Sequence, residues 1–133
     1  GTFQPVREAD ITRHRLLSER YRITKDVFDA VRRAKSEGRR IVAAGTTVTR
    51  ALEASVQEGI DRPVLEGAAA LFIYPGYSFK IIDALLTNFH LPRSTLIMLS
   101  AAFAGREKLM NAYKTAVKER YRFYSYGDAM FII

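Results

Sequence analysis

Three polar residues, Asp83, Asn88 and His90, interrupt an otherwise apolar part of the sequence. An imidazole titrates near neutral pH and can accept a proton during catalysis. A buried carboxylate is costly unless it is paired, so Asp83 needs either a partner such as Lys80 or Arg93 or a functional role. A lone histidine is also common as a hydrogen-bonded structural residue. The spacing therefore leaves two interpretations open, a structural turn and the wall of an active site with His90 or Asp83 as its base.

A second group of residues, in the segment AAGTTVTRALE, has the order strand, glycine, hydroxyl residues, helix. Gly45 lets the backbone approach a ligand closely, and Thr46 and Thr47 can bond to an anion at the positive end of the helix dipole. Arg50, one turn further on, can reach the same anion. The alternative is an ordinary capped helix with Arg50 paired to Glu53 or exposed to solvent. The segment has neither the glycine spacing of a dinucleotide-binding loop nor the lysine of a P-loop, which excludes those two motifs.

Aromatic residues alternate with a cation in a third segment, YRFYSYGDAM, over residues 121–130. Such a segment suits stacking on unpaired bases or on adenine. Within it, Tyr126 offers a ring, and Asp128 can bond to a ribose hydroxyl or an exocyclic amine. The alternative is a turn at the edge of a strand, with the aromatic residues in the core.

The net charge of the 133-residue chain is +7, and the basic residues lie mostly in its two ends. Residues 1–40 carry eleven Lys/Arg and six Asp/Glu, residues 41–105 carry four and five, and residues 106–133 carry six and three. Basic flanks around a neutral middle are compatible with a polyanion that crosses a neutral pocket, although solvated helix faces give the same pattern. The absence of Cys excludes disulfides and a thiol nucleophile within the chain and fits a reducing, cytoplasmic setting. With two His and no Cys we expect no metal site, and with no long apolar run we expect no membrane-spanning helix.

An α/β framework is needed to bring these candidate residues together. Apolar residues spaced for one helical face predict a helix from Thr24 to Gly38, and the apolar run after it predicts a strand over 40–44. Because helices and strands alternate, we predict a single α/β domain over residues 1–133. The further elements that we predict are a helix from Gly45 to Gly59, strands over 68–77 and 79–83, helices over 93–105 and 106–122, and a buried terminal strand that ends with MFII.

The chain resembles the C-terminal part of the S-adenosylmethionine:tRNA ribosyltransferase-isomerases, bacterial enzymes of queuosine synthesis. The resemblance covers nearly the whole chain. It rests on GTFQPV (1–6), GTTVTRALE (45–53), the long block over 72–99, AFAG (102–105) and YRFYSYGDAM (121–130). It implies a mixed sheet with flanking helices, as the C-terminal part of a larger two-domain protein with an upstream β-barrel insertion. The opening GTFQPV is also typical of a loop entered from an upstream strand.

The resemblance implies a reaction as well. The ribose of S-adenosylmethionine is transferred to 7-aminomethyl-7-deazaguanine at the tRNA wobble position and isomerised to an epoxycyclopentane ring, giving epoxyqueuosine, adenine and methionine. S-adenosylmethionine is then a substrate, and no cofactor is implied. The chemistry needs a base for the C5′ proton beside the sulfonium and groups that help adenine to depart. The implied partners are this tRNA and S-adenosylmethionine, and we expect a monomer.

Roles for individual residues follow from that chemistry as expectations. The expected catalytic residues are His90 and Asp83. The expected substrate-binding residues are Gly45, Thr46, Thr47, Arg50, Asn88, Tyr126 and Asp128, and those expected to meet tRNA phosphates are Arg93, Lys114, Lys118, Arg120 and Arg122. Three positions depart from the family's pattern: Leu17 stands in place of a His, and Ala69 and Ala70 in place of a Thr-Asp pair. The alternative function is a non-catalytic tRNA-binding module, or a portion that needs the N-terminal half to act.

Overall fold

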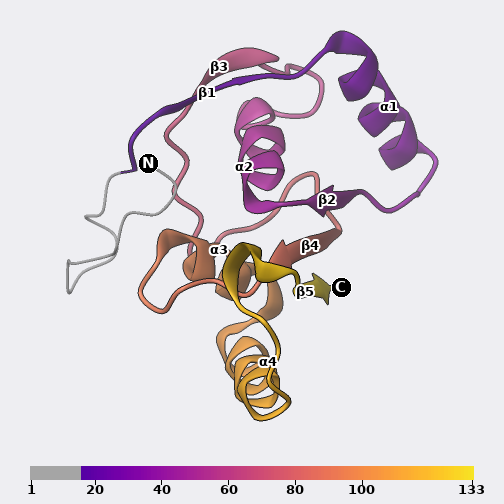
Figure 1. The fold of residues 1–133 in the computed structure, drawn as a ribbon. Helices are drawn as coiled ribbons and strands as arrows, with labels where there is room; N and C mark the ends of the chain where they lie inside the picture. Colours follow the sequence, from indigo (N-terminus) through magenta and orange to yellow (C-terminus); the bar gives the residue numbers. More distant parts are fainter. Residues whose placement is uncertain (1–15) are drawn as a thin grey trace.

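A computed structural model describes residues 16–133 of the chain (Figure 1). The GTFQPV segment (1–6), on which part of the resemblance rests, lies outside the described residues. In chain order the elements are β1 (Glu19–Arg22), α1 (Lys25–Ser36), β2 (Val42–Ala44), α2 (Thr46–Ser55), β3 (Glu66–Ala69), β4 (Ala84–Asn88), α3 (Thr95–Ala104), α4 (Arg106–Lys118), the 3-10 turn η2 (Tyr124–Tyr126) and β5 (Ala129–Ile132). Over this range, no helix is both long enough and apolar enough to cross a membrane.

The central sheet is mixed, with the strand order β2-β4-β5. β2 runs parallel to β4, and β5 runs antiparallel to it. A separate antiparallel pair, β1 and β3, lies beside α2, and β3 contacts that helix (Figure 1). The mixed sheet with its flanking helices confirms the predicted α/β class.

Each helix packs through only part of its apolar face, and in α4 Met110 and Val117 are 43% and 66% exposed. In α4 the buried residues are Leu109, Tyr113 and Ala116, which recur at helical spacing. They form one apolar cluster with Phe89 and Met130, so α4 covers the end of β4 and part of β5. A second cluster joins α1 and α2 to β2, and a third lies under α3. Together these clusters hold the two parallel strands at a fixed distance from the starts of α2 and α3.

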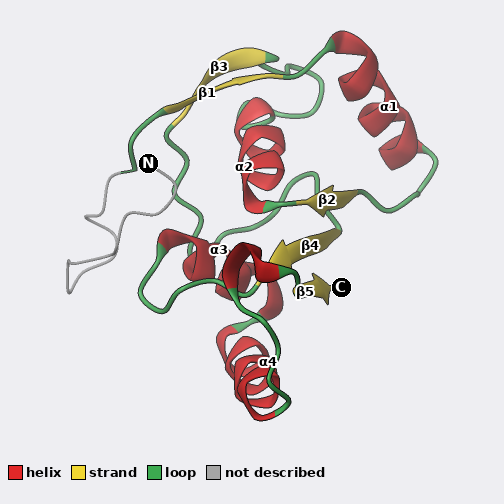
Figure 2. Ribbon diagram, viewed as in Figure 1, coloured by secondary structure: helices red, strands yellow, loops and turns green. Residues whose placement is uncertain are grey.

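The strand predicted over 79–83 is wrong, and the one predicted over 68–77 overlaps with β3, at Glu66–Ala69, only in its first two residues. The chain between β3 and β4 runs as a long loop (Figure 2). The reason is Glu53, whose fully buried carboxylate accepts the backbone N–H groups of Lys80, Ile81 and Ile82 at 2.9–3.2 Å. These amides therefore bond to a side chain rather than to a neighbouring strand. The strand forms five residues later, as β4, which the sequence analysis missed.

The predicted helices are confirmed, although two of them end early. α2 ends at Ser55 rather than near Gly59, and the Ser55 carbonyl accepts the Val64 N–H at 2.8 Å. α4 ends at Lys118 because Arg120 adopts a left-handed backbone with φ of 58°. The terminal strand is present as β5, but the prediction that it is buried is wrong for Phe131, which is 58% exposed.

Candidate active site

A cavity of about 340 Å³ opens at the carboxyl ends of the parallel strands β2 and β4. Residues 44–48 form one wall, where β2 passes into α2. Thr87, Asn88 and His90 form a second wall at the end of β4, and Ser94, Tyr124 and Ser125 complete the rim. Open α/β sheets bind ligands at this end of their strands, because loops and helix N-termini converge there. Five of the predicted site residues, Gly45, Thr46, Thr47, Asn88 and His90, are therefore brought together in one cavity.

The turn from β2 into α2 leaves the start of that helix open to the cavity. Gly45 has φ of 96°, a conformation that residues with a Cβ rarely adopt, and its N–H donates to the Leu86 carbonyl at 2.8 Å. Gly45 occupies the N-cap position and offers no side chain, so α2 has no side-chain cap. The N–H groups of Thr46 and Thr47, together with the helix dipole, can therefore bind an anion.

His90 is held from two sides at the cavity wall and is only 9% exposed. Its Nε2 lies 2.8 Å from the Thr87 hydroxyl oxygen. Its main-chain N–H donates to the Tyr113 hydroxyl at 2.7 Å, and that hydroxyl donates to the His90 carbonyl at 3.3 Å. Burial lowers the pKa of His90 below its ordinary value of 6.5, so the imidazole is neutral at pH 7 and can accept a proton.

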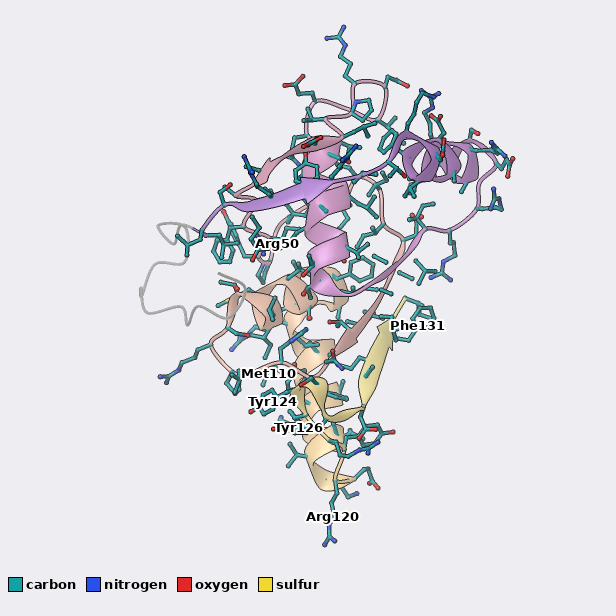
Figure 3. All side chains as sticks on the ribbon, turned by 45° about the horizontal axis from the view of Figure 1, so that its top comes forward. Arg50, Met110, Arg120, Tyr124, Tyr126 and Phe131 are labelled. Atoms are coloured by element: carbon teal, nitrogen blue, oxygen red, sulfur yellow. The ribbon has the colours of Figure 1, made fainter. Side chains whose placement is uncertain are left out.

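A short loop that contains η2 forms the other side of the cavity. Tyr124 lines the cavity, and its N–H donates to the Phe89 carbonyl at 2.9 Å. It has φ of 61°, which is uncommon for a residue with a large side chain. Tyr126 lies beside it but is 72% exposed and is not part of the cavity wall (Figure 3). The aromatic residue that the structure places at the site is therefore Tyr124, whereas the sequence analysis selected Tyr126.

Asp128 closes this loop and does not line the cavity. Its carboxylate accepts the Arg122 backbone N–H and pairs with the Arg122 guanidinium at 3.2 Å. The bonds from Arg122 hold the pKa of Asp128 below its ordinary value. The Asp128 carbonyl accepts the side-chain amide of Asn88 at 3.2 Å, so the loop is tied to the end of β4. The structure thus gives Asp128 and Arg122 contacts that shape the site.

Two further predicted residues, Arg50 and Asp83, lie outside the cavity wall. Arg50 is 4% exposed and points to the β1-β3 pair, where it bonds to Glu19 at 3.1 Å and to the Ala69 carbonyl at 3.5 Å. Asp83 precedes β4, at the end of the strand opposite to the cavity. Its carboxylate pairs with Lys35 at 2.8 Å and accepts the Ile41 N–H at 2.8 Å, so neither suggested partner, Lys80 or Arg93, is the one observed. These contacts give Arg50 and Asp83 structural roles.

The predicted RNA-binding cations are distributed around the site rather than inside it. Arg93 is exposed in the turn before α3, between Leu91 and Ser94, which both line the cavity. Lys114 and Lys118 are exposed on α4, and the exposed Arg120 follows that helix, beyond its far end in Figure 3.

Several site residues were not predicted from the sequence. Thr87 and Ser94 line the cavity, and Tyr113 fixes the backbone of His90. A signal for Ser94 was present, because the Ser-Thr pair before an apolar helix marks an N-cap, and Ser94 accepts the Ile97 N–H at 3.2 Å. No local signal identifies Thr87 or Tyr113. Among residues 16–133, no cluster of three or more His, Cys, Asp or Glu side chains could hold a metal ion.

The fold and the cavity define an α/β protein with a cavity at the carboxyl ends of its parallel strands, where a buried histidine lies beside an open helix start. Over residues 1–132 the chain matches the family described as Queuosine biosynthesis protein, and it belongs to that family.

Two curated relatives of this chain carry the same name. The chain is 58% identical over all 133 residues to the S-adenosylmethionine:tRNA ribosyltransferase-isomerase of Thermus thermophilus, and 55% identical to the protein of that name from Carboxydothermus hydrogenoformans. It covers 38% and 39% of these two proteins. The crystal structure of S-adenosylmethionine tRNA ribosyltransferase from Thermotoga maritima is similar, with a TM-score of 0.74 and 50% identity over 86% of this chain and 40% of that one. The chain thus spans about two fifths of the length of the relatives that it matches.

Proposed function

We propose that this chain is the C-terminal part of an S-adenosylmethionine:tRNA ribosyltransferase-isomerase and carries part of its active site. The reaction is transfer of the ribose of S-adenosylmethionine to 7-aminomethyl-7-deazaguanine at the wobble position of a cytoplasmic tRNA. Isomerisation to an epoxycyclopentane ring releases adenine and methionine. The names of the relatives support the overall activity. The observation that carries the proposal for this chain is the cavity, in which His90 faces the start of α2.

His90 is the proposed base. The C5′ proton of S-adenosylmethionine is acidified by the adjacent sulfonium, and a neutral imidazole is the form that can remove it. The lowered pKa keeps His90 neutral at pH 7, and Thr87 orients the ring through Nε2. Asp83 has no part in this step, because it lies at the other end of β4 and its carboxylate is engaged by Lys35 and Ile41.

The start of α2 is the proposed anion site. Thr46 and Thr47 supply backbone N–H groups and hydroxyls, and Gly45 leaves room for close approach. The anion is either the methionine carboxylate of S-adenosylmethionine or a tRNA phosphate. The Tyr124 ring offers a surface for a base, and Arg93 provides a cation at the rim for the tRNA backbone.

The test is release of free adenine from S-adenosylmethionine, with tRNA that carries 7-aminomethyl-7-deazaguanine present or absent. The assay uses this chain alone and a chimaera in which it replaces the matching 38% of the Thermus thermophilus relative. Release by the chimaera that depends on the modified tRNA supports the proposal. A folded chimaera that binds tRNA with steep salt dependence but releases no adenine contradicts it and favours a non-catalytic tRNA-binding module.

Variants of the active chimaera then locate the anion. Thr46→Ala combined with Thr47→Ala raises KM for S-adenosylmethionine if the methionine carboxylate binds at α2, and raises KM for tRNA if a phosphate binds there. Thr115→Ala, an exposed position on α4, is the matched control and leaves both values unchanged. If the double variant changes neither KM, the hydroxyls of Thr46 and Thr47 do not bind the anion.

A further inference from the structure

The outer edge of β5 is the least protected part of the described sheet. β5 pairs with β4 on one side, and within residues 16–133 no strand pairs with its other side. Edge strands normally carry a charge, a proline or a bulge that prevents pairing with another strand. The strand here reads AMFI and is followed by a final Ile, so it has no such residue. Its backbone is open to an added strand.

An apolar groove lies along this same edge. It has a volume of about 480 Å³ and runs between β5 and the junction of α3 and α4. Phe103, Leu109 and Ala112 line it from the helices, and Met130 and Ile132 line it from the strand. Lys108 is the charged residue in this wall. The lining suits a segment with apolar side chains that lies along β5.

The opposite face of the sheet is also apolar and open. Leu86 of β4 and Phe131 of β5 are opposed in register, and they are 42% and 58% exposed. Val42 of β2, on the same face, is 54% exposed, and Figure 3 shows Phe131 on the outer side of β5. A continuous apolar run such as AMFII is typical of a strand that is buried on both faces. The sequence of β5 therefore fits a covered strand, whereas the described residues leave one face and one edge uncovered.

We infer that the outer edge of β5 pairs with a strand from the upstream part of a longer polypeptide, which extends the sheet β2-β4-β5 by a fourth strand. The relatives support this occupant, because the chain covers only 38% of the Thermus thermophilus protein and 39% of the Carboxydothermus hydrogenoformans protein. An extended segment satisfies the free N–H and C=O groups of β5, which a helix does not do. Apolar side chains of the new strand fill the groove beside α4 and cover Phe131. This inference is independent of the reaction proposed above.

Hydrogen–deuterium exchange of the β5 amides tests the inference directly. The 133-residue chain is compared with the same chain joined to the part of the Thermus thermophilus relative that it does not match. The expected result is that β5 amides exchange roughly a hundredfold more slowly in the joined polypeptide, because a new strand protects them. Equal exchange in both forms overturns the inference. Slow exchange in the chain alone, together with a dimer in analytical ultracentrifugation, also overturns it, because the strand is then covered by a second copy.

A pair of substitutions separates strand docking from a general effect of surface charge. Phe131→Lys in the joined polypeptide restores fast exchange at β5 and lowers the melting temperature. Val117→Lys is the matched control, because Val117 is 66% exposed on α4 and lies outside the groove, and it leaves both readouts unchanged. Circular dichroism of the two variants in the 133-residue chain checks that each still folds. If Phe131→Lys and Val117→Lys behave alike, the edge of β5 is not the docking site.

Discussion

The Tyr113 hydroxyl bonds to both main-chain groups of His90. It accepts the His90 N–H at 2.7 Å and donates to the His90 carbonyl at 3.3 Å. Tyr113 is 7% exposed on α4, and burial raises the pKa of its phenol above the ordinary value, so the hydroxyl is protonated at pH 7. A single side chain from a distant helix therefore sets the position of the proposed base. Thr87 fixes the ring of the same residue, so His90 is held at its backbone and at its imidazole.

Replacing Tyr113 by Phe is expected to lower kcat more than it changes KM. The variant removes the hydroxyl that bonds to the backbone of His90, which destabilises the fold by about 1–3 kcal/mol and lets the imidazole shift. A misplaced base lowers turnover roughly tenfold to a hundredfold. Adenine release by the chimaera measures kcat and KM, and denaturant unfolding measures stability.

The control for this prediction is Tyr121→Phe. Tyr121 packs on the same ring of Phe89 but is 49% exposed. We expect Tyr121→Phe to keep the wild-type kcat. If Tyr113→Phe loses stability but keeps kcat, the hydroxyl supports the fold without positioning His90.

The buried imidazole of His90 predicts a pH dependence of stability. Because its pKa is lowered in the folded state, the unfolded chain takes up a proton at a higher pH than the folded chain does. The unfolding free energy contributed by this residue is therefore constant above the unfolded pKa of about 6.5 and falls as the pH drops below it. The fall is at most about 1.4 kcal/mol per pH unit and stops below the folded pKa.

Urea unfolding of the chain at about pH 7.5 and about pH 5.5 measures this dependence. His90→Gln removes it, because the amide has no proton to gain in this range. The same variant abolishes adenine release by the chimaera if His90 is the base. A His90→Gln chain that loses stability with falling pH as steeply as the wild type contradicts the assignment of a buried neutral imidazole.

The sequence alone identifies most of the elements around the site but not how they meet. The sequence predicts both GTT (45–47) at the start of α2 and the polar residues Asn88 and His90 at the end of β4 as candidate site segments. Their contact depends on the parallel pairing of β2 with β4, in which Ala44 opposes Leu86. Residues 79–83 and 84–88 are both short apolar runs, so periodicity does not decide which of them is the strand. The first run is not a strand because its backbone N–H groups, beginning with that of Lys80, donate to the carboxylate of Glu53, 27 residues earlier in the sequence.

Residue roles were predicted less well where they depend on long-range partners. Asp83 was correctly expected to need a partner, but Lys35 is 48 residues away, and only the packing of α1 brings it close. Arg50 was expected to bind a ligand or to pair with Glu53. Instead its guanidinium is buried against the β1-β3 pair, whose first strand was not predicted. The sequence indicates that a charged residue in an apolar segment needs a partner, but it does not identify that partner.

Asp83→Asn is now expected to destabilise the chain and to leave catalysis by the folded chimaera unchanged. Burial alone raises the pKa of this carboxyl, but the Ile41 N–H and the Lys35 ammonium outweigh it, and the net pKa is lowered. The stabilising contribution is therefore present above the ordinary pKa of about 3.8 and is lost as the pH falls through the lower folded value. Thermal unfolding as a function of pH measures the loss, and the variant is less sensitive to acid than the wild type.

The control is Asp61→Asn, an exposed position in the loop before β3, which leaves the melting temperature unchanged. Loss of turnover by a folded Asp83→Asn chimaera at neutral pH would restore Asp83 as a catalytic candidate.

Glu53→Gln is expected to cause a large loss of stability in this chain. The carboxylate is 0% exposed and accepts N–H groups from three consecutive residues, as well as the Tyr77 hydroxyl at 2.9 Å. An amide has the same shape, but its NH₂ group faces donors and leaves at least one of them without an acceptor. Since hydrogen bonds to a buried charge contribute about 1.5–3 kcal/mol and an unsatisfied donor costs a similar amount, we expect a loss of about 3 kcal/mol.

Urea unfolding measures this loss of stability against the control Glu58→Gln, an exposed position just after α2 that leaves stability unchanged. Because the same carboxylate fixes the chain just before β4, backbone amides of β4 should also exchange faster with solvent in Glu53→Gln. A variant as stable as Glu58→Gln would show that the loop before β4 is held by its apolar residues Ile81 and Ile82 and not by Glu53.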